Sequence, residues 1–564
     1  MSAIDWIVMF ATLAAFVAYG VWRGRGALGL KDYVLSGRSL KTPAVALGVM
    51  ATQASAVTFL ATPGQGFADG LRFVQFYFGL PLALIVVCLT AIPAFRAAGV
   101  FTAYEYLERR FDGKTRSLAT ALFLVQRGLS AGITIYAPAL VLSVLLGWDV
   151  RWMCLLIGAL AVIYTTTGGS KALGYAHVMQ FLIIIGTMGV AFALLVRALP
   201  PGIGIRDAAL AAGRLDRMHA LNLAFDPNDR YNLWSGLIGG FFLQLSYFGA
   251  DQSQVGRYLS ARSVDESRRG LLWNGLLKIP MQLGILFLGV LLFAFYLFAP
   301  GPLSFNPVAV AKVAASARAG EWHALELQYS GALARRAAAA RTYIEARRSH
   351  DATLAQSTGV TLRGAQAVTD SLRKQANGMI HSIDPAAPPT DTNYVFLSFV
   401  LQYLPMGLIG LILACIFAAA MNSSSSELNA LASTTVVDVV QRVSPVKTDA
   451  KSVAISRLAT IGWALFAVGF AEFAAGLGSL VEAVNIVGSL FYGTMLGIFM
   501  TGFLIRRATG TGVFVGAVIA EATVIVCFKA THISFLWYNL IGCLIVMLVA
   551  AFMSMGRRSD SVSA

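Results

Sequence analysis

The chain has 564 residues, is 57% hydrophobic and only 13% charged, and carries a formal net charge of +15. Its mean hydropathy of +0.70 excludes an ordinary soluble protein and predicts an integral membrane protein. The basic residues lie in short loops between apolar runs, so we interpret them as determinants of membrane orientation and not as a nucleic-acid-binding surface.

Apolar segments of about 20 residues predict about thirteen membrane spans. The first run, Trp6 to Val21, follows an acidic Asp5, so we interpret it as a true span and not as a signal peptide. Lys and Arg gather after the odd-numbered spans, which predicts an external N-terminus and a cytoplasmic C-terminus. The predicted spans are centred near Ala14, Gln53, Val86, Ile133, Gly158, Gly186, Phe242, Ile285, Cys415, Leu465, Thr494, Val518 and Val546.

Small and polar residues interrupt two of these spans in corresponding places. The interruptions read GVMATQASAVTFLATPG from Gly48 to Gly64 and LQLSYFGADQSQVGRY from Leu243 to Tyr258. An unwound helix at membrane depth has free carbonyl groups that suit an ion. Two such breaks in two five-helix halves predict a transporter built from inverted repeats.

A long connection from Ala299 to Asn393 separates two of the later spans. It contains an Ala- and Arg-rich stretch from Val308 to Arg348 and a second helical pattern from Leu362 to Ile380. We expect an external helical hairpin with a structural or partner-binding role.

The most informative polar run is FAAAMNSSSSELNALAS, from Phe417 to Ser433. In a helix, Ala419, Asn422, Ser423 and Ser426 share one face, which offers neutral oxygens and no fixed charge. Such a face suits a monovalent cation such as sodium. The alternative is that these groups only bond to preceding carbonyls or to a neighbouring helix. Five consecutive polar residues favour an ion or substrate site.

Four further motifs agree with one another: AAAMNSSSSELNALASTTVVDVV, YFGADQSQVGRYLSARS, FTAYEYLERRF and LVEAVNIVGSLFYGTMLGIF. Together they resemble the sodium/solute symporter family, whose members transport glucose, proline, sialic acid, monocarboxylates and vitamins. ITIYAPALVLSVLLG and MATQASAV are most similar to the monocarboxylate and vitamin branch, whereas GADQ and Lys278 look like the sugar branch. The resemblance implies an all-α LeuT-type fold of two inverted five-helix repeats and sodium-driven import by alternating access.

This fold divides the chain into six expected parts. They are a first helix and cytoplasmic loop at 1–42, a first repeat at 43–198, an extracellular loop at 199–232, a second repeat at 233–299 and 394–508, an extracellular helical insert at 300–393, and two last spans with a short cytoplasmic tail at 509–564.

The resemblance also implies a sodium site between the second and ninth spans. Asn422 stands where the family usually has Ser, but its side chain still offers an oxygen. The implied ligands are Ala51, Ala54, Ala419, Asn422 and Ser423.

Family members with a second sodium use further hydroxyls of the ninth span and an Asp on the sixth. The matching residues here are Ser425, Ser426 and, in place of the Asp, His177. Because His177 supplies no negative charge, we expect one sodium per solute. His177 is also a source of pH dependence, unless burial keeps it neutral.

The resemblance places the substrate in a central site lined by intramembrane polar residues. Lys278 and Asp251 either line this site or only pair with each other. Arg127 either binds a carboxylate or extends to the cytoplasmic edge of the membrane. The full expected set is Gln53, Thr58, Tyr247, Asp251, Gln252, Lys278, Asn485 and Arg127.

These observations predict a sodium-coupled symporter that imports a small polar organic solute across the plasma or inner membrane. The alternatives are a proton-coupled or facilitative carrier of the same fold and a transporter-like sensor. We do not expect an enzyme, because the sequence contains no nucleophile or metal-ligand constellation and no phosphate-binding glycine loop.

Overall fold

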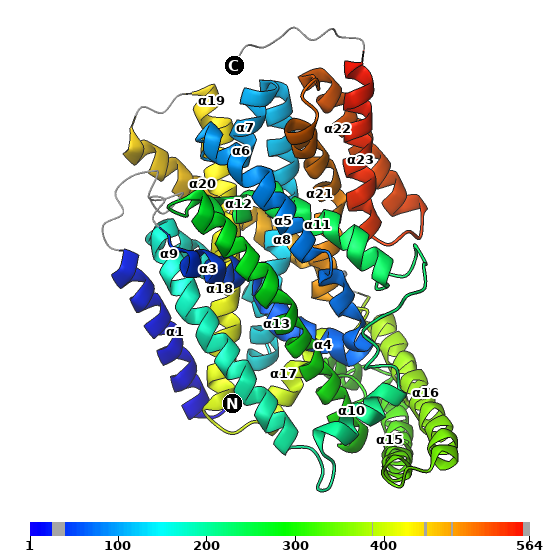
Figure 1. Ribbon diagram of the computed structural model, residues 1–564. Helices are drawn as coiled ribbons and strands as arrows, with labels where there is room; N and C mark the ends of the chain where they lie inside the picture. Colours follow the sequence, from blue (N-terminus) through cyan, green and yellow to red (C-terminus); the bar gives the residue numbers. More distant parts are fainter. Residues whose placement is uncertain (25–39, 386, 445–447, 475–477, 556–564) are drawn as a thin grey trace.

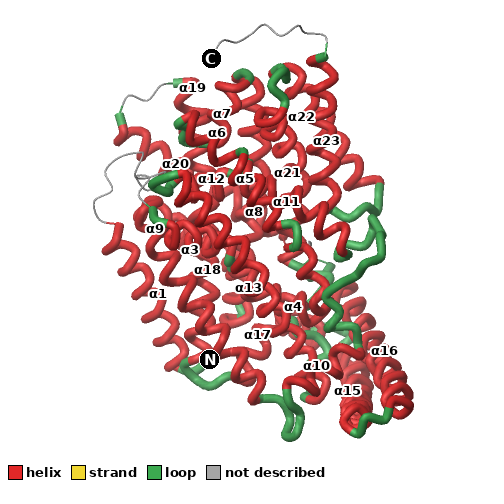
Figure 2. Tube along the Cα trace, in the orientation of Figure 1, coloured by secondary structure: helices red, strands yellow, loops and turns green. Residues whose placement is uncertain are grey.

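The computed structural model describes residues 1–24, 40–385, 387–444, 448–474 and 478–555. The expected cytoplasmic loop at 25–39 and the tail from 556 lie outside these residues. Helices joined by loops make up the described residues, and Figure 2 draws no strand among them. A single isolated bridge joins Leu40 to Ala261.

The first half of the chain forms a series of helices whose lengths follow its apolar runs. Polar side chains cap three of them. The Thr102 side chain accepts from Glu105 N, the Asp112 side chain from Thr115 N and the Asp149 side chain from Arg151 N. The elements are α1 (Ala3–Gly24), α3 (Thr42–Gln53), α4 (Ala56–Asp69), the 3₁₀ helix η2 (Gly70–Tyr77), α5 (Leu80–Leu89), α6 (Ala91–Ala98), α7 (Ala103–Arg110), α8 (Gly113–Leu146) and α9 (Val150–Arg197).

The second half repeats the pattern of a broken helix followed by long apolar ones. Its elements are α10 (Ile205–Arg214), the π-helix η3 (Ser235–Gly239), α11 (Gly240–Gly249), α12 (Gln252–Leu259), α13 (Val264–Phe298), α14 (Pro307–Ala314), α15 (Ala319–Arg348), α16 (Ala352–Ile383), α17 (Thr392–Tyr403), α18 (Leu408–Thr434), the π-helix η4 (Thr435–Val440), α19 (Gln441–Val443), α20 (Asp449–Ala474), α21 (Leu480–Leu504), α22 (Gly510–Ala530) and α23 (Leu536–Ser554).

All of the predicted span centres lie within helices. In the described part of the chain, nine helical segments are long and apolar enough to cross a membrane, and Ala3–Tyr19 and Val150–Thr166 are shorter apolar stretches. The spans expected near Gly158 and Gly186 lie in one continuous helix, α9. The number of spans that cross the membrane stays a prediction.

Both predicted helix breaks are confirmed. The first separates α3 from α4 at Ala54 and Ser55, where the Ala54 backbone leaves the helical region with φ −85° and ψ 71°. The second separates α11 from α12, and the Asp251 side chain caps α12 by accepting from Ser253 N at 2.9 Å. Each break exposes helix-terminal polar groups inside the bundle, where only a ligand or a side chain can satisfy them.

The second segment of the first broken helix, α4, packs closely on α13. An added Cβ at Gly289 would lie 2.1 Å from the Pro63 carbonyl oxygen, and one at Gly66 would lie 2.3 Å from the Leu286 carbonyl oxygen. The absence of side chains at these glycines therefore lets the two backbones touch, which fixes α4 against α13.

The predicted helical hairpin is confirmed as α15 and α16, which lie side by side at one end of the molecule (Figure 1). Its core contains Trp322, Tyr329 and Leu372. Arginines connect it to the rest of the protein. Arg336 donates to the Tyr296 carbonyl at 2.5 Å, and Arg348 donates to Asp207 and holds the pKa of that carboxyl below its usual value.

Arg373 forms an ion pair that is better shielded from solvent than the pair of Arg348. Its Nη2 donates to both carboxylate oxygens of Asp391 at 2.7 Å, and its guanidinium lies 4.9 Å from the Phe305 ring centroid. Asp391 also accepts from Phe305 N at 2.8 Å, so the pair links α16 to the start of α17.

We expect Arg373→Met to lower thermal stability, because it leaves Asp391 without its cation at a mostly buried position. The expected loss is about 3 kcal/mol, measured by thermal unfolding of the purified protein in detergent. Lys374→Met, which changes the exposed neighbouring residue, is the matched control. Equal unfolding temperatures for the two variants would show that the pair does not hold the hairpin.

Candidate functional site

The predicted sodium ligands meet where the first broken helix contacts α18. Ala51, Ala54 and Ala419 belong to one buried cluster. The Ser423 hydroxyl reaches across and donates to the Thr52 carbonyl at 3.2 Å. The structure therefore brings the break of α3–α4 and the polar run of α18 into direct contact.

Asn422 is the least satisfied residue of this group. It is 1% exposed, and neither polar atom of its side chain has a hydrogen-bond partner in the described part of the chain. Buried polar atoms normally have partners. An unpaired amide oxygen beside helix-terminal carbonyls is the kind of oxygen that a bound sodium ion uses.

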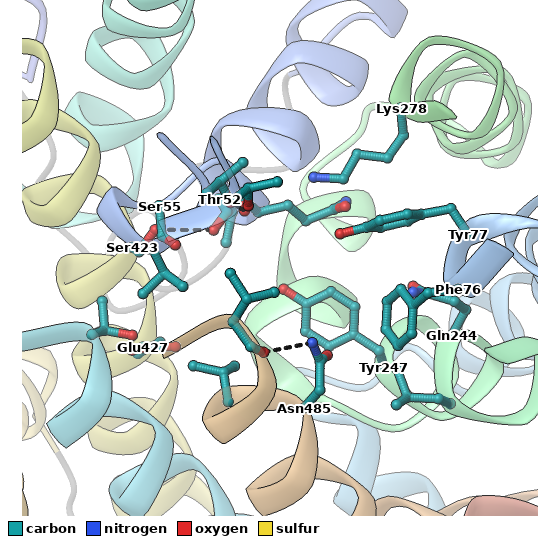
Figure 3. A pocket seen from close by; sticks show the side chains of 18 of the residues that line it. Thr52, Ser55, Phe76, Tyr77, Gln244, Tyr247, Lys278, Ser423, Glu427 and Asn485 are labelled. Carbon is teal, nitrogen blue, oxygen red and sulfur yellow. Dashed lines mark hydrogen bonds between the residues drawn. The ribbon is translucent and has the colours of Figure 1, made fainter. Parts of the chain in front are cut away.

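A cavity of about 130 Å³ lies beside this group, between the two broken helices (Figure 3). Ser423 lines it together with Thr52 and Ser55, so the cavity is continuous with the predicted sodium ligands. Aromatic side chains from the other elements, Phe76, Tyr77 and Tyr247, form much of the opposite wall. The predicted substrate residues that line it are Gln53, Thr58, Arg127, Tyr247, Lys278 and Asn485.

Arg127 forms the centre of a buried charged cluster in the cavity wall. It donates to Glu427 at 3.0 Å, to Tyr492 at 2.7 Å and, through Nη2, to Asp251. The Tyr492 hydroxyl donates to Asp251 at 2.9 Å. The side chain is 3% exposed, so the alternative that Arg127 extends to the membrane edge is wrong.

Lys278 enters the cavity from α13, on the side opposite Ser423 and Glu427 (Figure 3). Its Nζ lies 5.8 Å from the centroid of the Tyr77 ring. No carboxylate in the described residues forms an ion pair with it. The alternative that Lys278 pairs with Asp251 is wrong, because Asp251 is bound by Arg127 and Tyr492.

Two of the expected substrate residues have other partners. Asp251 lies behind Arg127 and caps α12. Gln252 accepts from Ala103 N at 2.9 Å and donates to the Phe101 carbonyl at 3.1 Å, which ties α12 to the start of α7. Both therefore support the cavity wall.

The candidate second ion site also has a partner that the sequence did not reveal. Ser425 and Ser426 donate to the Asn422 carbonyl at 3.1 and 2.8 Å. Arg257, from α12, donates to Ser426 at 2.6 Å and lies 3.2 Å from His177 Nδ1. A guanidinium group thus contacts two of the three residues of that predicted site, Ser426 and His177.

Sequence reasoning missed Glu427 and Tyr492 as parts of this site. Glu427 follows Ser423 by one helical turn and ends the polar run, so its position was a usable signal. Tyr492 lies in an aromatic and glycine-rich stretch of α21 that looks like ordinary helix packing. Only the fold brings it to Arg127.

Comparison with known proteins agrees with the resemblance found in the sequence. The family model described as "Sodium:solute symporter family" matches residues 33–328 and 382–520. The matched stretches leave out 329–381, which lie in the helical insert.

Two curated relatives match over most of their length. Sodium-coupled monocarboxylate transporter 1 of Homo sapiens is 27% identical over 522 residues, which are 91% of this chain and 71% of that protein. Sodium/sialic acid symporter NanT of Aliivibrio fischeri (strain ATCC 700601 / ES114) is 25% identical over 560 residues, which are 97% of this chain and 92% of that protein.

A solved structure shows the same architecture. It is the substrate-bound outward-open state of a Na⁺-coupled sialic acid symporter, with a TM-score of 0.75 at 23% identity over 98% of each chain. This likeness confirms the predicted LeuT-type fold.

Replacement of Arg127 and replacement of Lys278 by a neutral residue should have opposite effects on the stability of the protein. Arg127→Met leaves Asp251 and Glu427 uncompensated and should destabilise the protein by about 3–5 kcal/mol. Lys278→Met removes a buried charge that no described carboxylate pairs with, so thermal stability should stay equal or rise. Thermal unfolding in detergent measures both. A similar loss in the two variants would show that Lys278 is also ion-paired.

Proposed function

Because the chain belongs to the sodium:solute symporter family, we propose that it uses a sodium gradient to import a small organic solute with one carboxylate group. The protein is a multi-pass membrane transporter and not an enzyme. In this proposal the ion binds between the α3–α4 break and α18, and the solute binds in the adjoining cavity. The two broken helices then reorient around both ligands in an alternating-access cycle.

The sodium part of the proposal is supported by the unpaired amide of Asn422 and by its neighbours. Ser423 supplies a hydroxyl oxygen, and the end of α3 supplies carbonyls at Ala51 and Ala54. Glu427 adds a carboxylate one turn along α18, which makes the local potential more favourable for a cation. The proposed ligand set is Ala51, Ala54, Ala419, Asn422 and Ser423.

The proposed substrate class rests on one observation, the unpaired buried charge of Lys278. Arg127 is already neutralised by two carboxylates, whereas Lys278 is a buried cation with no described ionic partner. A buried charge is strongly disfavoured unless something pairs with it. A solute carboxylate beside the Lys278 ammonium group would provide that pairing.

The size of the cavity limits the solute. An apolar cavity of about 150 Å³ holds a molecule of about six non-hydrogen atoms, and the cavity here is about 130 Å³. The walls at Phe76, Leu243 and Val484 are apolar. A short monocarboxylate fits this space better than a sugar or a sialic acid does. The same charge argument disfavours a sugar, which would leave Lys278 without a counter-charge.

The orientation in the membrane follows from the same proposal. We place the protein in the plasma or inner membrane, with the N-terminus outside and the C-terminus in the cytoplasm. In support, α1 begins at the end of the bundle where the α15–α16 hairpin lies, and α23 ends at the opposite end (Figure 1). The hairpin is then external. Its arginine contacts with Tyr296 and Asp391 support a structural role within this chain, in preference to the binding of a partner.

Uptake of radiolabelled L-lactate into proteoliposomes tests the driving ion. We expect an inward sodium gradient to accumulate lactate, and an inward proton gradient with choline in place of sodium to leave it at equilibrium. Ser423→Ala removes a ligand oxygen and should raise the sodium concentration for half-maximal uptake by about fivefold or more.

Ser433→Ala is the matched control, because it makes the same change on the same helix and, among the described residues, the Ser433 hydroxyl bonds only to the Ala430 carbonyl. Accumulation driven by protons alone would instead favour the proton-coupled alternative. Unchanged sodium dependence in Ser423→Ala would remove Ser423 from the ion site.

Lys278→Met should abolish lactate uptake while thermal stability is retained, because the solute carboxylate loses the one cation of the cavity lining that no described carboxylate neutralises. Lys278→Arg keeps the charge and should retain part of the activity. Wild-type uptake should be inhibited by short monocarboxylates and not by lactamide or glucose. Lactate uptake at the wild-type rate in Lys278→Met, or inhibition by lactamide equal to that by lactate, would contradict this assignment.

A further inference from the structure

A second cavity, of about 240 Å³, lies between α1, α8, α9 and α18 and shares no lining residue with the solute cavity. Its outer wall is α1, which packs against α9 and α18 at one edge of the bundle (Figure 1). Asp5 fixes this wall, because its carboxylate accepts from Gly407 N at 2.7 Å, at the start of α18. An added Cβ at Gly410 would lie 2.1 Å from the Asp5 carbonyl oxygen, so the two backbones touch.

The walls of this cavity are almost wholly apolar. Apart from the Trp6 indole and the Ser424 hydroxyl, every lining side chain is aliphatic, aromatic or a thioether. Phe10 and Leu160 line the cavity and are also exposed at the surface of the protein. They lie on apolar helical stretches, whose exposed side chains face lipid. The cavity is therefore accessible to a molecule dissolved in the bilayer.

Ser424 is the polar exception in the inner wall. It is 1% exposed, and its hydroxyl has no hydrogen-bond partner among the residues that the structure describes. A buried serine in a helix commonly bonds to a carbonyl one turn earlier, as Ser426 does to the Asn422 carbonyl at 2.8 Å. A buried polar group without a partner costs free energy. This hydroxyl therefore marks the point where the polar group of a ligand would be held.

The cavity also contacts the rear of the helix that carries the proposed sodium ligands. Four cavity residues share one face of α18, because their spacing is i, i+3, i+4 and i+7: Phe417, Ala420, Met421 and Ser424. Asn422 follows Ala420 by two residues, which places it about 200° around the helix. A molecule in the cavity and an ion at Asn422 would thus contact opposite sides of the same two turns.

The size and the charge of the cavity limit its ligand. An apolar cavity of about 150 Å³ holds about six non-hydrogen atoms, so a volume of about 240 Å³ has room for about ten. No lining residue is charged, so an ionised group would be strongly disfavoured there. A neutral hydroxyl group, in contrast, can donate to Ser424 or accept from it.

We propose that this cavity binds a neutral aliphatic alcohol of about eight to ten carbon atoms, which enters from the bilayer and forms a hydrogen bond with Ser424. Its chain lies against the apolar side chains of α1, α8 and α9. The inference does not depend on the solute or the ion that this carrier transports. It assigns to the rear of α18 a site for a membrane-dissolved molecule, separate from the solute cavity.

Photolabelling of the full-length protein in phosphatidylcholine nanodiscs tests the inference. The probe is azi-octanol, an octanol that carries a photoreactive diazirine, and mass spectrometry of peptides locates its adducts. We expect saturable adducts on the cavity residues of α1, α9 and α18, which unlabelled octanol prevents. Octane and the octanoate anion, at the same concentration in the bilayer, should compete about fivefold less well or worse. Octane lacks the hydroxyl group, and octanoate brings a charge into an apolar cavity.

Two variants locate the site independently. Ser424→Ala removes the hydrogen-bond partner and should weaken saturable labelling by about fivefold. Ser433→Ala makes the same change on the same helix outside the cavity and should label like wild type. Ala161→Leu fills part of the cavity from α9 without changing α18, and it should prevent saturable labelling. Unfolding temperatures without the probe show that each variant is folded.

Saturable labelling of Ser424→Ala and Ala161→Leu with the affinity of wild type would overturn the inference. Adducts confined to residues outside the cavity would overturn it as well, since the probe would then bind only at the lipid-facing surface. Competition by octane equal to that by octanol would overturn the assigned chemical class, because the Ser424 hydroxyl would then contribute nothing to binding.

Discussion

The arrangement of this transporter depends on one buried guanidinium group. Arg127 binds Glu427, Asp251 and Tyr492, so residues of α8, α18, α21 and the start of α12 meet at a single point. A charge at this depth is tolerated only when it is paired, and removal of one partner leaves the others uncompensated. The pairing therefore fixes the break of the second broken helix against the polar run of α18. It also holds one wall of the cavity in a form where the charge of Arg127 is already neutralised, which leaves Lys278 on the other side as the cation available to a ligand.

The breaks and the polar run could be predicted from the sequence because their signals are local. A run such as Asn422 to Ser426 contrasts with the apolar residues before it, and the small polar residues around Ala54 and Asp251 contrast with theirs. The helical hairpin was predictable for the same reason, from the spacing of apolar residues in a polar stretch. These features need no knowledge of which helix lies beside which. The predicted sodium ligands accordingly come together, with Ala51, Ala54 and Ala419 in one cluster and Ser423 bonded to Thr52.

The pairings between helices could not be predicted in this way. Asp251 could have paired with either Lys278 or Arg127, and nothing in the periodicity of a uniformly apolar helix indicates which face meets which neighbour. The partner of Asp251 proved to be Arg127, 124 positions away, and the partner of Ser426 is Arg257, 169 positions away. The same limit applies to Gln252, which looked like a cavity residue but bonds to the backbone before α7. Glu427 differs from these, because its place one turn after Ser423 was visible in the sequence.

Charge balance gives a physical basis for the proposed coupling. The two cations at the cavity, Arg127 and Lys278, are matched in number by the carboxylates Asp251 and Glu427. Sodium alone would add an uncompensated positive charge to a site of low dielectric constant, and a carboxylate solute alone would add a negative one. Both together restore the balance, so each ligand improves the site for the other, and this gain is necessarily reciprocal. In this mechanism the number of ions that move with each solute is set by the net charge that the interior can hold, and the helix breaks form the site where ion and solute bind together.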